Sequence, residues 1–80
     1  MKVLVTGGAG YIGSAIAHCM VDRGVNVHVI DDLSTGSEKL LPEKVKFYKL
    51  DIGNEDAITK IIKNFSPDII IHLAASVEVE

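Results

Sequence analysis

The sequence is poor in several residue types, and each shortage argues against a class of protein. The 80 residues include one cysteine, two prolines and no tryptophan, so neither a disulfide-rich scaffold nor a proline-rich disordered segment is expected. The apolar run Ile69-Ile70-Ile71 ends at His72, and no stretch approaches the ~20 apolar residues of a membrane-spanning helix. The eight lysines and arginines are dispersed and the net charge is −3, unlike a nucleic-acid-binding face. We expect neither a membrane nor a nucleic acid as partner.

The remaining composition is that of a small globular domain. Hydrophobic residues make up 48% of the chain and charged residues 24%, a balance that suits one buried core. A chain of 80 residues has room for a single domain at most. The stretch from Met1 to Thr6 is too short, and too soon followed by glycines, to be a signal peptide. We therefore expect a cytoplasmic protein.

Short apolar runs alternate with helical patterns along the chain. Four runs rich in β-branched residues predict strands, at residues 3–6, 25–30, 45–50 and 68–73. Helical spacing covers residues 11–23 and 54–65, and residues 33–43 indicate a loop with one helical turn. This order predicts an α/β fold of Rossmann type, with a parallel sheet in strand order 3-2-1-4 and helices on both faces. The lysines of the third strand suit an outer position.

The spacing of apolar residues predicts which side of each helix packs on the sheet. In the first helix the inner face should carry Ile12, Ile16, Cys19 and Met20, with Cys19 as a small core residue. Ser14 and His18 then fall on the solvent side. In the second helix one stripe should pack on the sheet, made of Ile58, Ile61, Ile62 and Phe65.

A glycine-rich turn joins the first strand to the first helix. Gly7 allows a sharp turn out of the strand, Gly10 lets the backbone approach a pyrophosphate, and Gly13 lets the helix pack closely on the sheet. Backbone N–H groups near Tyr11 and Ile12, at the positive end of the helix, would then bind the anion. An ordinary strand-to-helix turn is the alternative. No Gly-Lys-Ser/Thr string closes the motif, which excludes a P-loop.

An acidic pair, Asp31 and Asp32, ends the second strand. A carboxylate at this position can accept hydrogen bonds from the ribose hydroxyls of adenosine. A 2′-phosphate would instead meet two negative charges, with no lysine or arginine before Lys39. The pair therefore predicts NAD rather than NADP, although either residue could be a solvated turn residue.

Two further segments follow strands at the same edge of the sheet. Asp51 could accept a hydrogen bond from the adenine amino group, with Ile52 against the ring, or it could cap the following helix; both interpretations stay open. The small residues of Leu73-Ala74-Ala75 would let a cofactor pass over the backbone. His72 is close enough to this edge for an indirect role in shaping the site. The histidines and Cys19 lack metal-ligand spacing, so no metal site is expected.

Together, these segments resemble the extended short-chain dehydrogenase/reductase family, and within it the UDP-glucose 4-epimerases. The likeness lies in residues 6–14, 31–36, 51–52 and 72–76. It implies an NAD-dependent enzyme that moves hydride from a UDP-sugar to bound NAD and returns it to the other face of the keto sugar. The family's NAD contacts would fall on Tyr11, Ile12, Asp31, Asp32, Leu33, Ser34, Thr35, Gly36, Asp51, Ile52, Leu73, Ala74 and Ala75.

The catalytic residues that this resemblance implies are absent from the sequence. The family uses a Tyr-x-x-x-Lys pair, but Ala15 and Ile52 stand four residues after Tyr11 and Tyr48. We therefore expect residues 1–80 to be the N-terminal part of an NAD-binding Rossmann domain, inactive alone and without its substrate domain. The UDP-sugar would bind through the rest of the enzyme, which could form a homodimer. A nucleotide-sugar dehydratase or decarboxylase, and a non-catalytic NAD-binding module, are the alternatives.

Overall fold

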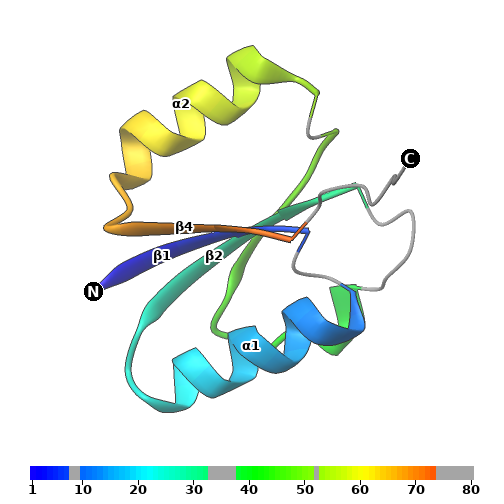
Figure 1. Ribbon diagram of the computed structural model, residues 1–80, viewed down its shortest axis with the longest axis vertical. Helices are drawn as coiled ribbons and strands as arrows, with labels where there is room; N and C mark the ends of the chain where they lie inside the picture. Colours follow the sequence, from blue (N-terminus) through cyan, green and yellow to red (C-terminus); the bar gives the residue numbers. More distant parts are fainter. Residues whose placement is uncertain (8–9, 33–37, 52, 74–80) are drawn as a thin grey trace.

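A four-stranded parallel sheet lies between two helices (Figure 1). The computed structural model describes residues 1–7, 10–32, 38–51 and 53–73. Its elements follow the expected order: β1 (Lys2–Thr6), α1 (Tyr11–Asp22), β2 (Asn26–Asp31), a 3₁₀ turn η1 (Glu38–Leu40), β3 (Lys46–Lys49), α2 (Glu55–Phe65) and β4 (Ile69–His72). The strands are ordered β3-β2-β1-β4, which confirms the predicted fold class.

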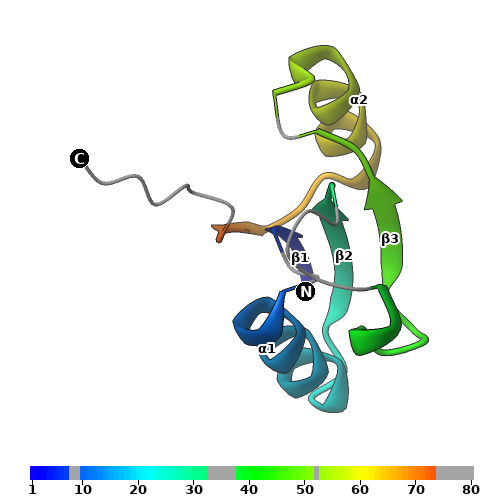
Figure 2. The same cartoon turned by 90° about the vertical axis from the view of Figure 1, so that its right-hand side faces the viewer.

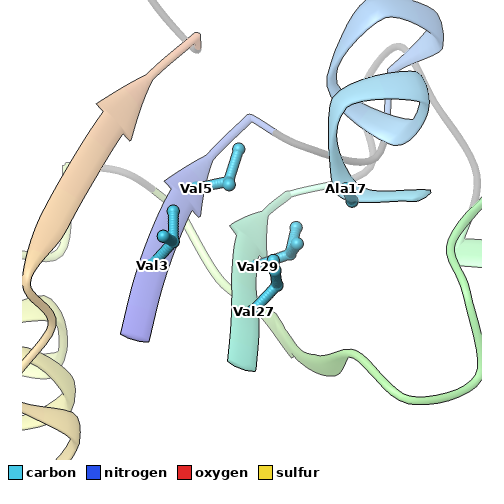
Figure 3. Close-up of a cluster of buried hydrophobic side chains, with 5 residues drawn as sticks. All are labelled: Val3, Val5, Ala17, Val27 and Val29. Carbon is cyan, nitrogen blue, oxygen red and sulfur yellow. The ribbon is translucent and has the colours of Figure 1, made fainter. Parts of the chain in front are cut away.

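The central strand β1 supplies both halves of the core, because neighbouring side chains of a strand point to opposite faces. Val3 and Val5 pack with Val27 and Val29 of β2 on the face that α1 covers. Figure 3 shows these four valines on the two strands, with Ala17 of α1, which belongs to the same cluster. Leu4 points the other way and packs with Ile30 and Phe65 under α2. Figure 2 shows the resulting three layers, with one helix on each side of the sheet.

Helix α1 meets the sheet through its smallest residues, and part of the prediction for its inner face is wrong. The buried residues of α1 are Gly13, Ser14 and Ala17, whereas Cys19 is exposed and Ile12 is 67% exposed. Glycine and alanine let a helix approach the strands closely, so they define the contact face. The Ser14 hydroxyl is satisfied locally, because it donates to the Tyr11 carbonyl oxygen at 3.0 Å.

Helix α2 confirms its predicted stripe and caps its own N-terminus. Ile58, Ile61 and Ile62 pack with Phe65 against the sheet. The Asn54 side chain is the N-cap and accepts a hydrogen bond from the Ala57 N–H at 3.2 Å.

The two outer strands differ in how well they are covered. β3 carries Lys46 and Lys49 at its ends, and the strand order confirms its predicted outer position. On β4, Ile69 and Ile70 remain 44% and 49% exposed, although an apolar strand such as this is typical of a sheet covered on both faces. Within the described residues, neither helix has the length and apolar character needed to cross a membrane.

Candidate cofactor site

The segments singled out from the sequence follow the carboxyl ends of the strands, which lie along one edge of the sheet. The Gly7 N–H, directly after β1, donates to the Ile30 carbonyl oxygen of β2 at 2.6 Å. On the other side of β1, the Leu73 N–H donates to the Thr6 carbonyl oxygen at 2.8 Å. The Leu50 N–H, after β3, donates to the Asp31 carbonyl oxygen at 3.0 Å. Ligands of open parallel sheets bind in the crevice outside this edge.

The three glycines of the turn have three different environments. Gly7 has a φ of 82°, in the left-handed region where a side chain is strained. Gly13 is buried in the face of α1 that packs on the sheet. Gly10 has a φ of −80° and a ψ of 179°, which any residue adopts, and among the described residues an added Cβ would meet the Gly7 carbonyl oxygen at 4.0 Å. Neither backbone strain nor packing against the described residues therefore requires a glycine at position 10.

The N-terminus of α1 lacks the groups that neutralise the same end of α2. Helix α2 has the Asn54 cap and two acidic residues in its first turn, Glu55 and Asp56. Helix α1 begins after Gly10, has no side-chain cap and has no acidic residue in its first turn. Its first N–H groups have no acceptor within the helix, and the helix dipole adds positive potential there. This end of α1 fits an anion such as a pyrophosphate.

Helix α1 begins with two exposed residues. Tyr11 and Ile12 are 85% and 67% exposed, and the first backbone bond of the helix runs from the Ser14 N–H to the Gly10 carbonyl oxygen at 2.9 Å. The N–H groups of Tyr11 and Ile12 therefore precede the helical ladder at an accessible surface. An anion bound at the N-terminus of α1 would therefore contact the backbone of both residues.

Asp31 ends β2 beside the glycine turn, as the sequence predicts. It is 9% exposed and follows Ile30, whose carbonyl oxygen accepts the bond from Gly7. Asp31 and the start of the glycine turn thus follow neighbouring strands, an arrangement that suits a ribose beside a pyrophosphate. Asp32 is exposed. The predicted contacts at Leu33, Ser34, Thr35 and Gly36 lie outside the described residues.

Asp51 closes a turn before α2, and the alternative prediction that it caps this helix is wrong. Its Oδ1 accepts a hydrogen bond from the Gly53 N–H at 2.9 Å, and its carbonyl oxygen accepts one from the Asn54 N–H at 2.9 Å. Asn54 takes the N-cap position instead. Asp51 is exposed at the sheet edge, which leaves the adenine contact as its predicted role. Ile52 lies outside the described residues.

The end of β4 adds a side-chain contact to this edge. The Thr6 Oγ1 lies 2.6 Å from the His72 Nδ1, and the partly exposed Leu73 follows. Sequence reasoning gave His72 only an indirect part and did not single out Thr6, whose only signal is a hydroxyl at the end of an apolar strand. Ala74 and Ala75 lie outside the described residues. The described residues hold no cluster of metal-ligating side chains.

The sequence profile of the NAD dependent epimerase/dehydratase family matches residues 3–80. The chain belongs to this family. The family resemblance expected from the sequence is therefore confirmed, and so is NAD as the cofactor of the family. The match includes every segment of the sheet edge described above.

Known members of the family show the same fold over this length. The UDP-glucose 4-epimerase of Thermus thermophilus, in complex with NAD, is 39% identical with a TM-score of 0.90, over 99% of this chain and 25% of that one. The enzyme of Thermotoga maritima, with UDP-glucose, is 38% identical with a TM-score of 0.91, over 96% and 25%. The UDP-glucose 4-epimerase of Azospirillum brasilense is 40% identical over 98% of this chain and 22% of its own length. The chain thus spans about a quarter of these relatives.

Proposed function

We propose that this chain is the NAD-binding N-terminal part of a nucleotide-sugar epimerase that interconverts UDP-glucose and UDP-galactose. The observation that carries the proposal is the bond from Gly7 to Ile30, which brings the turn leading to the uncapped N-terminus of α1 next to the end of β2, where Asp31 follows. The epimerase assignment, rather than a dehydratase of the same family, is supported by relatives that are UDP-glucose 4-epimerases.

In this proposal the pyrophosphate lies against the bare backbone at Gly10 and accepts hydrogen bonds from the N–H groups of Tyr11 and Ile12. The Asp31 carboxylate accepts from the adenosine ribose, and Asp51 from the adenine amino group. The proposed cofactor contacts are Gly7, Gly10, Tyr11, Ile12, Gly13, Asp31, Asp32, Leu33, Ser34, Thr35, Gly36, Asp51, Ile52, Leu73, Ala74 and Ala75.

The part of this chain in the reaction is to bind and orient. When bound, NAD would supply the chemistry of reversible hydride transfer. The described residues supply a positive helix end for the pyrophosphate and carboxylates for the adenosine. The acid–base residues and the UDP-sugar pocket belong, in this proposal, to residues outside this chain. Accordingly, we expect NAD binding but no turnover from residues 1–80.

The cofactor assignment is tested by titrating the chain with NADH and NADPH and following nicotinamide fluorescence. We expect NADH to bind more tightly, because a 2′-phosphate would meet the Asp31 carboxylate. Asp31→Ala should weaken NADH binding by about 1–3 kcal/mol, the loss expected for hydrogen bonds to a charged group. Asp22→Ala is the matched control, since it removes the same charge from the far end of α1.

Each outcome of this titration has a distinct meaning. Equal affinity for NADH and NADPH would contradict the role of Asp31, and no binding of either would reject the proposed function. The reaction itself is tested in the whole enzyme, where UDP-galactose should become UDP-glucose without net oxidation. Net loss of water from the sugar would identify the dehydratase alternative.

A further inference from the structure

A single side-chain contact joins two segments of the proposed cofactor site that are far apart in sequence. The Thr6 Oγ1 and the His72 Nδ1 lie 2.6 Å apart, across 66 residues of chain. The two residues are register partners in the parallel pair β1 and β4. Each is the last residue of its strand. The contact therefore lies where the chain leaves the sheet toward both segments.

The backbone around Thr6 is held by both neighbouring strands. Its carbonyl oxygen accepts from the Leu73 N–H at 2.8 Å, and the next N–H, that of Gly7, donates to the Ile30 carbonyl oxygen at 2.6 Å. Gly7 then turns the chain with its φ of 82°. Any rotation of the chain at Thr6 would swing the glycine turn and the N-terminus of α1 relative to the end of β4.

The backbone bond from Leu73 holds this point at the very end of β4. Among the described strands β4 pairs with β1 alone, and strand ends open most readily. Thr6 is 5% exposed, so its hydroxyl requires a partner within the fold. His72 is that partner, although its own ring is exposed. The pair therefore anchors the end of the outer strand to a buried point of the central one.

We propose that the Thr6–His72 hydrogen bond is a positioning contact, which fixes the direction of the glycine turn relative to the end of β4. Both are positioning residues, acting through the turn that Gly7 begins and through Leu73. The inference rests on the proposed function, because it assigns the contact a part in the affinity for NAD. A pyrophosphate site of backbone N–H groups gains affinity when its geometry is fixed before binding.

The test compares variants that remove the bond with one that retains it. Thr6→Val keeps the branched shape and loses the hydroxyl, whereas Thr6→Ser keeps the hydroxyl. His72→Phe keeps a ring and loses Nδ1. We expect Thr6→Val and His72→Phe each to weaken NADH binding about fivefold to tenfold, and Thr6→Ser to stay within about twofold of the wild-type affinity. The double variant should bind no more weakly than either single variant, because both remove the same bond.

A second readout separates this inference from the proposed function. Without cofactor, the amide resonances of Gly7 and Gly10 should shift in Thr6→Val and His72→Phe but not in Thr6→Ser. Thermal unfolding of each variant shows that the comparison is made between folded chains. If the wild-type chain fails to bind NADH, the proposed function is rejected, and the Gly7 and Gly10 amides still decide whether the contact orients the turn. Unshifted amides, or additive losses in the double variant, would overturn the positioning role.

Discussion

Gly10 and Gly24 differ in whether their backbone conformation requires a glycine. Gly24, which follows α1, has a φ of 83° and open space around an added Cβ. Its lack of a side chain therefore serves the backbone conformation alone. Gly10 has an ordinary φ of −80°, so its backbone conformation does not require glycine, and in the proposed function its lack of a side chain leaves space for the pyrophosphate. An alanine at each position should consequently affect a different property.

We expect Gly10→Ala to change the free energy of unfolding by less than about 1 kcal/mol, because its backbone conformation suits alanine. NADH affinity should fall at least about tenfold, since a Cβ would enter the space proposed for the pyrophosphate. Gly24→Ala is the matched control: it should lose about 1–2 kcal/mol of unfolding free energy, the strain of a left-handed residue, and leave the affinity of the folded chain unchanged. Denaturant titration and NADH titration measure the two quantities. Unaltered affinity in Gly10→Ala would remove the pyrophosphate from this position.

His28 lies on the α2 side of the sheet, where its surroundings disfavour the protonated form. Its ring stacks on Phe65, with centroids 3.5 Å apart and planes 8° apart. Its Nδ1 lies 3.1 Å from the Tyr48 hydroxyl. Burial lowers the pKa of His28 below its ordinary value of 6.5, and the positive charge of Lys46 lowers it further. A second cation, Lys2, lies over the Phe65 ring at 5.8 Å. Proton uptake by this imidazole is therefore opposed by the fold.

The lowered pKa predicts a loss of stability in mild acid. Above pH 6.5 His28 is neutral in both the folded and the unfolded chain, so it makes no pH-dependent contribution. As the pH falls below 6.5, the unfolded chain takes up the proton first, and the free energy of unfolding decreases until the folded pKa is passed. His28→Phe keeps a stacking ring and removes the titrating group, so its stability should depend less on pH. Denaturant unfolding at about pH 7.5 and about pH 5.5 measures this, and an equal dependence on pH in both proteins would contradict it.

At the scale of elements, the sequence predicts where the helices lie better than which side of them packs. In α2 the residues that pack are also the large apolar ones, such as Ile58 and Ile62, so their periodicity identifies the face. In α1 the buried residues are small ones, including Gly13 and Ala17, while of the predicted large residues Met20 packs partly on the core. A pattern that weights apolar size selects Ile12 and Cys19 instead, and both are exposed. A helix can approach a sheet closely where its side chains are small, and a hydropathy pattern does not record the size of side chains.

The site was predictable to the extent that it follows from topology. Parallel strands end at one edge, so Gly7 and Asp31 had to lie close together once their strands were neighbours. The Thr6–His72 contact also requires the register of two strands joined through 66 residues, which no local pattern determines. The role of Asp51 was open between an adenine contact and the cap of α2, because a cap depends on local backbone geometry. Asn54 occupies the position from which a side chain reaches the Ala57 N–H.

For the whole molecule, the two outer edges of the sheet differ in the protection they carry. β3 has lysines at both of its ends, and such charges oppose pairing with a further strand. β4 has none between Ile69 and Ile71, and two of these isoleucines are about half exposed. An apolar outer strand with unpaired backbone groups on one side is a template for another strand.

We expect the isolated chain to self-associate through residues 69–73 as its concentration rises. Ile70→Lys should abolish the association, because a charge at this edge opposes strand pairing. Leu40→Lys is the matched control, since Leu40 is 43% exposed but lies in η1, away from the outer side of β4. Sedimentation across a concentration series measures the mass. A wild-type chain that stays monomeric and unfolds cooperatively at high concentration would contradict the expectation.

The strand order also sets the sequence of events when the chain is made on a ribosome. β1 emerges first, yet its two partners are β2, which follows one helix later, and β4, which is the last of the four strands to appear. One flank of the central strand therefore stays bare until residues 69–72 have left the exit tunnel. Closing that long loop costs more entropy than joining β1 to β2. Nascent chains that have not yet exposed β4 therefore present an unpaired side of β1, a feature that makes partly folded chains prone to aggregate.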